Sequence, residues 1–153
     1  MLQAKTTPTG FELKNTQQKL TLADNQIGLG ELIVDEPGEY EAEGVEIIYG
    51  QSAALIVWDK LQIVYAFGAD KPTPFEKAQF SPSDVVIFSQ ALPSLSKTFF
   101  NETLEIYDPN LVIVSATANL EEVKSSIKTE PVDSAKISDQ TMPEEGREYI
   151  VLA

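Results

Sequence analysis

The sequence contains no cysteine and no histidine. Without cysteine there can be no disulfide, thiolate zinc site, iron–sulfur cluster or Cys nucleophile. Without histidine the chain lacks the commonest metal ligand and the usual general base near neutral pH. Carboxylates, Lys, Tyr, Ser and Thr are left for chemistry, so the sequence predicts no catalytic residue, no zinc or other metal site and no cofactor.

Positive charge is scarce: 11 Lys and Arg stand against 24 Asp and Glu, which gives a net charge of −13. Nucleic-acid binding depends on cations that neutralise phosphates, and anionic membranes attract cationic segments in the same way. The composition therefore predicts a soluble, acidic protein with no nucleic-acid and no membrane partner.

Long hydrophobic runs are also missing. The longest, such as Ala53–Trp58 and Val85–Phe88, are far too short to span a bilayer, and residues 1–10 lack the apolar stretch of a signal peptide. We therefore expect a cytoplasmic protein. The 153 residues suit one domain, residues 1–153.

The first half of the chain has the patterns of β-strands. Phe11 and Leu13 alternate with polar residues before a polar turn at residues 15–18, and Leu20 and Leu22 follow it, which predicts an N-terminal hairpin. Residues 31–35 form a further short strand pattern that ends at a Pro-Gly turn. Residues 44–49, 53–58 and 61–67 follow, the last two joined by Asp59-Lys60 as an antiparallel hairpin.

The second half mixes strand and helix patterns. The runs 85–88 and 111–114 are continuously apolar, which predicts strands covered on both faces. A helix is expected over about residues 94–106, with Ser94 as its N-cap, and a second helix from Asn119, whose side chain would cap Glu122. Residues 134–138, a turn at residues 143–146 and a strand over residues 148–152 close the chain. This order predicts one mixed α/β domain with a β-rich N-terminal half.

Two segments carry a resemblance to a known family. Leu32–Glu41, which contains Pro37-Gly38-Glu39-Tyr40-Glu41, resembles a Pro-Gly-Glu-Tyr-Glu segment of metallo-β-lactamase-fold hydrolases of the ascorbate-6-phosphate-lactonase-like branch. Met142–Gly146 and the following strand resemble the closing segment of the same family. The similarity covers roughly residues 11–152. It implies a shortened αββα sandwich, with two sheets and helices outside, that lacks one strand–loop–helix unit.

The resemblance also implies a lost metal site. Hydrolases of this family hold divalent ions with His and Asp side chains and use them to activate water. Their HxHxDH loop would fall before Leu32, where only residues 25–31 are present. The bridging Asp corresponds to Ala69 or Asp70, the late His to Ala116, and Asp24 matches a structural Asp. We refer to Asp24, Ala69, Asp70 and Ala116 as the former-site positions.

Two further patterns have both a functional and a structural interpretation. Seven carboxylates lie between Glu31 and Glu46, in a stretch without positive charge from Lys19 to Lys60. They suit Ca²⁺, Mg²⁺ or a basic partner surface, but the alternation of Glu39, Glu41 and Glu43 also fits a solvated strand face. The string Ser94–Lys97 resembles a Ser–Lys nucleophile pair and equally the start of a helix.

The sequence therefore predicts a catalytically inactive homologue, a pseudoenzyme that serves as an interaction, structural or ligand-binding domain. We expect a homo-oligomer or a protein partner to cover the face left by the missing unit. The alternative is a carboxylate-only hydrolase of phosphate esters or lactones that uses Asp24, Asp70 or Glu39 with Mg²⁺, Mn²⁺ or Ca²⁺. In a third possibility, a partner supplies the missing metal ligands.

Overall fold

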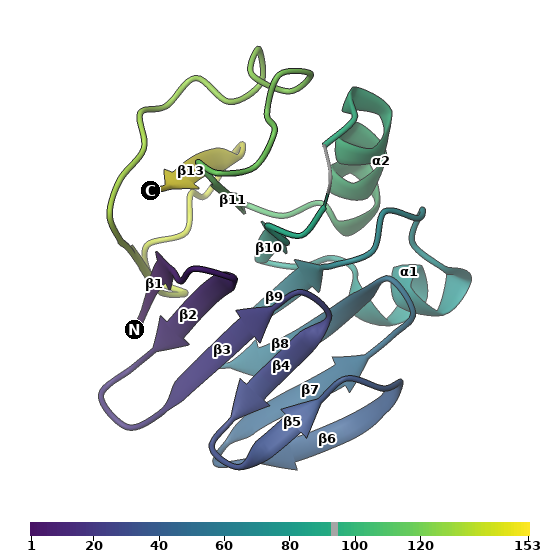
Figure 1. Ribbon diagram of the computed structural model, residues 1–153, viewed down its shortest axis with the longest axis vertical. Helices are drawn as coiled ribbons and strands as arrows, with labels where there is room; N and C mark the ends of the chain where they lie inside the picture. Colours follow the sequence, from purple (N-terminus) through teal and green to yellow (C-terminus); the bar gives the residue numbers. More distant parts are fainter. Residues whose placement is uncertain (93–94) are drawn as a thin grey trace.

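Two β-sheets stack face to face, and two helices pack against one of them, in the computed structural model, which describes residues 1–92 and 95–153 (Figure 1). Sheet A has the strand order β12-β1-β2-β3-β4-β5, and sheet B has the order β13-β11-β10-β9-β8-β7-β6. The strands of sheet A are β1 (Leu2–Thr6), β2 (Gly10–Lys14), β3 (Lys19–Ala23), β4 (Gln26–Leu29), β5 (Leu32–Val34) and β12 (Ala135–Ile137). Those of sheet B are β6 (Gly38–Ala42), β7 (Val45–Tyr49), β8 (Ala53–Trp58), β9 (Leu61–Ala66), β10 (Val85–Phe88), β11 (Leu111–Ser115) and β13 (Glu148–Leu152). The helices are α1 (Pro74–Phe80) and α2 (Lys97–Tyr107).

Sheet A is built from antiparallel hairpins. Phe11 pairs with Leu22 and Leu13 with Leu20, so the predicted N-terminal hairpin is confirmed in its register. Strands β1 and β4, which the sequence patterns did not reveal, extend this hairpin on both sides.

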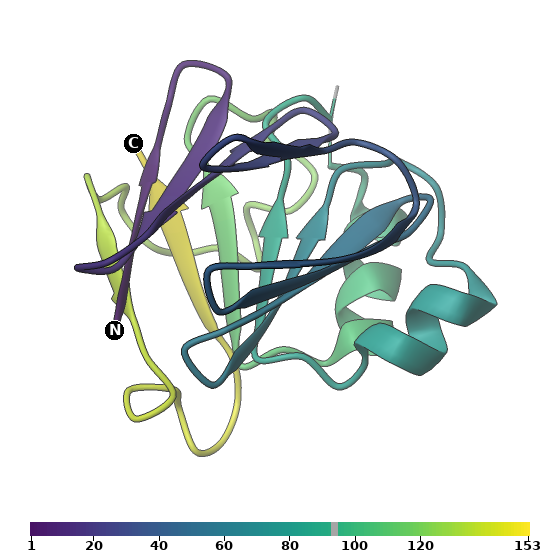
Figure 2. The same ribbon diagram turned by 90° about the horizontal axis from the view of Figure 1, so that it is seen from below.

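Sheet B has an antiparallel half and a parallel half. Strands β6 to β9 pair antiparallel in sequence order, whereas β9, β10, β11 and β13 pair parallel and point the same way in Figure 2. Asp59 and Lys60 both have positive φ, 49° and 65°, which suits a two-residue turn whose twist matches that of the flanking strands. The hairpin predicted there is confirmed.

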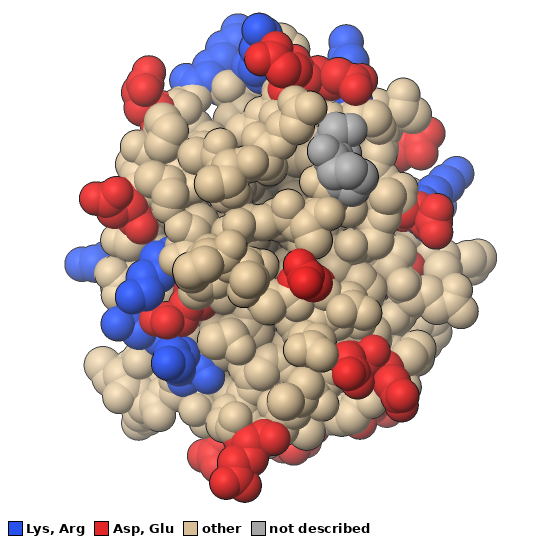
Figure 3. Space-filling view, viewed as in Figure 1, with Lys and Arg blue, Asp and Glu red and all other residues tan. Residues whose placement is uncertain are grey.

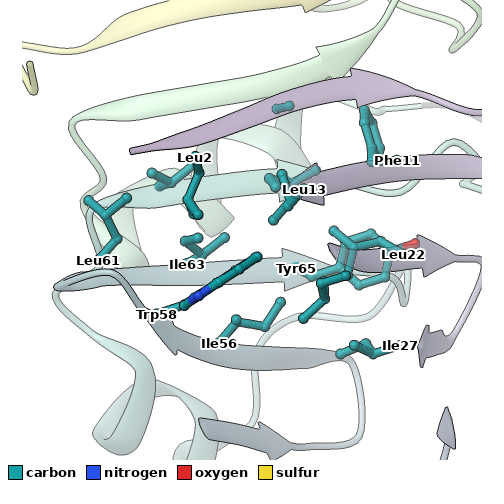
Figure 4. Packing of buried hydrophobic residues seen from close by; sticks show 14 of the residues in the cluster. Leu2, Phe11, Leu13, Leu22, Ile27, Ile56, Trp58, Leu61, Ile63 and Tyr65 are labelled. Atoms are coloured by element: carbon teal, nitrogen blue, oxygen red, sulfur yellow. The ribbon is translucent and has the colours of Figure 1, made fainter. Parts of the chain in front are cut away.

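The main core lies between the two sheets. Leu13 and Leu22 of sheet A face Ile56, Trp58 and Ile63 of sheet B, all buried (Figure 4). Polar residues alternate with these apolar ones along sheet A, so only one face of that sheet contributes to the core.

A second core lies between sheet B and the helices. Strands β10 and β11 are buried along their whole length, as their continuous apolar runs predicted. Phe100 and Leu104 of α2 pack there with Phe88 and Val112. Among the described residues, no helix has the length and apolarity needed to cross a bilayer.

The predicted α/β sandwich of αββα type is wrong. The chain is mostly β, with 41% strand and 12% helix, and its two helices both pack on sheet B. The outer face of sheet A has no helix over it among the described residues and carries polar side chains such as Lys5, Glu12 and Lys14. This mostly polar surface differs from the apolar face that we expected a partner to cover, although Ile33 of β5 is exposed.

The helix predictions were partly wrong. Helix α2 begins at Lys97 with Ser96 as its N-cap, while the expected start and cap at Ser94 lie outside the described residues. The helix expected from Asn119 is a series of turns, in which the Asn119 side chain accepts a hydrogen bond from the Glu121 N–H, not from that of Glu122. Val123 and Ile127 are nevertheless buried in the second core, because a series of turns can also place two residues of this spacing on the same side of the chain.

Candidate binding pocket beside helix α1

The start of α1 is fixed by a capping box that the sequence analysis missed. The Thr73 hydroxyl accepts a hydrogen bond from the Glu76 N–H at 3.1 Å, and the Glu76 carboxylate accepts one from the Thr73 N–H at 2.8 Å. Pro74 fits the first turn because a helix leaves the N–H groups of that turn without helical partners. The signal Thr-Pro-x-Glu was present in the sequence, before a helix of only seven residues.

Glu76 also anchors α1 to sheet B. Its carboxylate accepts hydrogen bonds from the N–H groups of Ser52 and Ala53, both at 2.9 Å, and from the Ser52 hydroxyl at 2.6 Å. Burial alone would raise the pKa of Glu76, but the hydrogen bonds from Ser52, Thr73 and Ala53 outweigh it and lower that pKa. Glu76 is therefore a buried carboxylate that stays charged and positions the helix.

A pocket of about 630 Å³ opens between this helix start and the β6–β7 end of sheet B. Glu39 is the single formally charged residue in its lining, and Ile48 and Phe75 contribute apolar walls. The Phe75 side chain is 52% exposed, although it is a large aromatic group. The full lining is Pro37, Gly38, Glu39, Ile48, Tyr49, Gly50, Gln51, Thr73, Pro74 and Phe75.

An acidic groove of about 260 Å³ continues from the pocket across β6 and β7. Glu39 and Ile48 line both spaces, and Glu41 and Glu46 add two carboxylates to the groove. Glu41 lies directly opposite Glu46 in the strand register, an arrangement that is unfavourable for like charges. The pocket and groove together favour a ligand with an apolar part and a positive charge.

The residues of the Pro-Gly-Glu-Tyr-Glu block meet at this site. Pro37, Gly38 and Glu39 line the pocket, and Glu41 lines the groove. Tyr40 lines the groove too; its ring packs against the main core, and its hydroxyl donates to the Glu36 carbonyl at 2.9 Å. The sequence analysis singled out this block for its resemblance to a family segment, not as part of a pocket, and it did not single out residues 73–75 on the opposite wall.

The former-site positions do not form a site of this kind. Asp24, Ala69, Asp70 and Ala116 are all exposed. Within residues 1–92 and 95–153, no three or more His, Cys, Asp or Glu side chains come together in a way that could hold a metal ion. The same holds for the seven carboxylates between Glu31 and Glu46.

Polar side chains at the carboxyl ends of β10 and β11 instead bond to neighbouring protein groups. The Gln90 side-chain amide donates to the carbonyls of Thr7 and Gly10 in the β1–β2 hairpin. Its oxygen accepts from the Thr117 hydroxyl at 3.3 Å, and the Thr117 and Ser115 hydroxyls are 2.8 Å apart. These contacts join the two sheets at the edge where the resemblance would have placed the metal site.

Two tyrosines hold the β3–β4 turn against sheet B. The Tyr65 hydroxyl donates to the Asp24 carbonyl at 2.6 Å, and the Tyr49 hydroxyl donates to the Asn25 carbonyl. Burial raises the pKa of each tyrosine to about 12, and the nearby charge of Asp35 adds to the effect at Tyr49. Both groups therefore act as hydrogen-bond donors over the whole neutral range.

These tyrosines predict a loss of stability at alkaline pH. Tyrosines of the unfolded chain lose their protons near pH 10.0, whereas Tyr49 and Tyr65 keep theirs up to about pH 12 in the folded protein. The folded state then binds more protons, so the free energy of unfolding falls as the pH rises through this window. Urea unfolding followed by Trp58 fluorescence measures the fall. The variant Tyr65→Phe should show a shallower pH dependence, and an unchanged slope would contradict the assignment.

In comparisons with known proteins, no family model, no curated protein and no solved structure matches this chain. The resemblance to metallo-β-lactamase-fold hydrolases therefore stays a prediction, and the assignment of a function depends on the geometry of the pocket.

Proposed function

We propose that this chain is a non-catalytic binding domain whose pocket beside α1 takes an apolar group that carries a positive charge. The observation that carries the proposal is the composition of the pocket. A space of about 630 Å³ with apolar walls has one carboxylate, Glu39, at its rim. Binding pockets commonly combine an apolar lining with a few polar groups that orient the ligand.

The exposed Phe75 supports this proposal. As a residue Phe75 is 52% exposed, so it gives up apolar burial that folding would otherwise use. A ligand that covers the ring would bury this surface, and an aromatic face also attracts cations. Phe75 and Glu39 both line the pocket, so one ligand could contact both side chains.

The ionisable groups of the pocket support a non-catalytic role. General-base catalysis needs a group whose pKa lies near the working pH. Tyr49 has a pKa raised to about 12 and its hydroxyl is engaged with the Asn25 carbonyl. The Thr73 hydroxyl already accepts the Glu76 N–H, and Glu39 is left as the sole carboxylate of the lining. No nucleophile–base pair is formed by these residues.

Titration calorimetry with three matched probes tests the proposal. Phenethylamine carries an aromatic ring and a positive charge, 2-phenylethanol has the ring alone, and 3-phenylpropionate has the ring and a negative charge. We expect the amine to bind best and the anion worst. Equal binding of amine and anion, or no binding of the amine, would contradict the proposed ligand class.

Two variants separate the contributions to binding. Glu39→Gln should weaken binding of the amine about threefold to fivefold and leave the alcohol unchanged, because a partly exposed ion pair contributes up to about 1 kcal/mol. Phe75→Ala should weaken both probes, since both bury the ring. Glu31→Gln, an exposed carboxylate outside the pocket lining, is the matched control and should change neither. An amine affinity that is the same in the Glu39 variant would place the charge contact elsewhere.

A further inference from the structure

The outer face of sheet A concentrates positive charge in an acidic protein. Lys5, Lys14, Lys19 and Lys136 lie on β1, β2, β3 and β12, and each directly follows or precedes a strand residue that belongs to the main core. Their side chains therefore point away from the core, to the face that no helix covers in the described structure. Figure 3 shows basic side chains gathered over the region of β1 and β2, and acidic ones at the end of the molecule where β5 and β6 lie.

Three of these lysines form a row across adjacent strands. Gln3 pairs with both Lys136 and Lys14, and Lys14 pairs with Lys19. The three lysines and Gln3 therefore lie side by side across β12, β1, β2 and β3, with Gln3 between Lys136 and Lys14. Neighbouring strands are about 4.8 Å apart, so the row extends over roughly 14 Å. We call Lys136, Lys14 and Lys19 the lysine row.

The lysine row takes part in no ion pair within the described structure. Lys5 pairs with Glu12 at 3.7 Å, but no carboxylate of residues 1–92 or 95–153 lies within 4.0 Å of a lysine of the row. Lys14 and Lys19 lie directly opposite each other, which is unfavourable for two like charges. A groove of about 430 Å³, lined by Gln3, Lys14, Lys136 and four neighbouring residues, lies at the part of the row formed by Lys136 and Lys14.

The acidic groove across β6 and β7 is the complementary surface. It contains the opposed pair Glu41 and Glu46, as the lysine row contains the opposed pair Lys14 and Lys19. The groove lies on sheet B, where Tyr40 and Ile47 of its lining face the main core and the adjacent Glu41 and Glu46 point to the other face of the sheet. The lysine row lies on the outer face of sheet A. Within one molecule, the lysines of the row do not pair with the carboxylates of the groove.

We propose that the lysine row of one molecule binds the acidic groove of a second copy of this chain. Each surface supplies the charge that the other lacks, and both belong to the same chain. The contact joins two different surfaces, so the association is head to tail and leads to a ring or an open filament. Glu41 and Glu46 do not line the pocket beside α1, so this inference goes beyond the proposed ligand and does not depend on it.

Salt concentration gives the first test. At about 0.15 M salt the Debye length is about 8 Å, so the repulsion between distant charges of two acidic molecules is largely screened while apposed charges still attract. At about 1 M salt it is about 3 Å, and the contact should weaken strongly. Sedimentation velocity should show concentration-dependent association at the lower salt and monomer at the higher. A monomer in both, or association that salt does not weaken, would overturn the proposal.

Charge reversal identifies the two surfaces. The variants Lys14→Glu/Lys19→Glu and Glu41→Lys/Glu46→Lys should each be monomeric alone, because like charges then face each other. Their equimolar mixture should associate again, because the contacts then join opposite charges. The matched control, Lys124→Glu/Lys128→Glu, makes the same change in net charge at exposed residues away from the row and should associate like the unmodified protein.

The outcomes of the charge reversal are decisive in both directions. Recovery in the mixture also shows that both variants are folded. The milder Lys14→Gln/Lys19→Gln variant should reduce association without reversing the charge. Association of the reversed variants alone, no recovery in the mixture, or an equal loss in the control would overturn the proposal.

Discussion

Replacement of Glu76 by alanine should lower the free energy of unfolding by about 3–5 kcal/mol, because it removes a buried charged acceptor and leaves its donors unpaired. Those donors are the N–H groups of Ser52, Ala53 and Thr73 and the hydroxyl of Ser52. The loss also releases the start of α1 from sheet B. Because Thr73, Pro74 and Phe75 form one wall of the pocket, the alanine variant should also bind the aromatic amine more weakly.

The pH dependence distinguishes the charge of Glu76 from its shape. Its pKa is lowered in the folded protein, so its stabilising contribution is complete above the usual glutamate pKa and is lost as the pH falls through the folded value. Glu76→Gln keeps the shape and removes this titration. Urea unfolding followed by Trp58 fluorescence should give a lower stability for the Gln variant at pH 7 and a smaller difference from the unmodified protein in acid.

Glu31→Gln is the control for the Glu76 variants. Glu31 is an exposed glutamate between β4 and β5 of sheet A and lines neither of the two pockets beside α1. Its replacement should change the unfolding free energy by less than about 0.5 kcal/mol. If Glu76→Gln were as mild as this control and kept the full acid dependence, Glu76 would not be the anchor of the helix.

Gly10→Ala should destabilise the fold by about 3 kcal/mol or more, because there is no space for a methyl group at this position in β2. A Cβ atom on Gly10 would overlap the carbonyl group of Leu22 on the paired strand. The backbone cannot easily move away, since the Gly10 N–H donates to the Thr7 hydroxyl and the Gly10 carbonyl accepts from both Thr7 and Gln90.

Gly30→Ala is the matched comparison for Gly10→Ala. Gly30 has a φ of 60°, and a Cβ atom there would meet nothing within 4 Å. Its replacement should cost only the backbone strain of a left-handed residue, about 1–2 kcal/mol. Thermal and urea unfolding of both variants measure the difference. A Gly10 variant that is as stable as the Gly30 variant would show that the β2–β3 pairing is looser than described.

The strand patterns of the sequence predicted much of the fold correctly, because alternating or continuous apolar residues report burial directly. The hairpins around residues 15–18 and 59–60 and the fully buried strands β10 and β11 follow from such patterns. Strands β1 and β4 were missed. Each is short and mixed in polarity, and pairing with a neighbouring strand compensates for this weak local signal.

The αββα prediction depended on the resemblance. A pattern in the sequence indicated instead that one face of sheet A lies in solvent. Lys5, Lys14 and Lys19 alternate with core residues along three strands, as expected for a sheet with one face in solvent. The helix expected at Asn119 was wrong for another reason. Spacings of three and four residues require only that Val123 and Ile127 lie on one side, and a series of turns satisfies this as well as a helix.

The candidate site could be predicted only in part. The Pro37-Gly38-Glu39 segment was singled out by its similarity to a family block, and it forms one wall of the pocket. The other wall lies more than thirty residues away in the sequence and reaches the site because Glu76 bonds to the β7–β8 turn. That contact is between distant residues, so no local pattern reveals it. The former-site positions were given only as what the resemblance implies, and their assignment stays a prediction.

Chemical-shift mapping of the isotope-labelled protein with phenethylamine tests the central claim most directly. The claim is that the space between the β6–β7 hairpin and α1 is the binding site. The backbone amides of Gly38, Gly50 and Gln51 line that space and should show the largest shifts. Shifts concentrated at Ser89, Ser115 or Thr117, at the carboxyl ends of β10 and β11, or the absence of any localised shift, would contradict it.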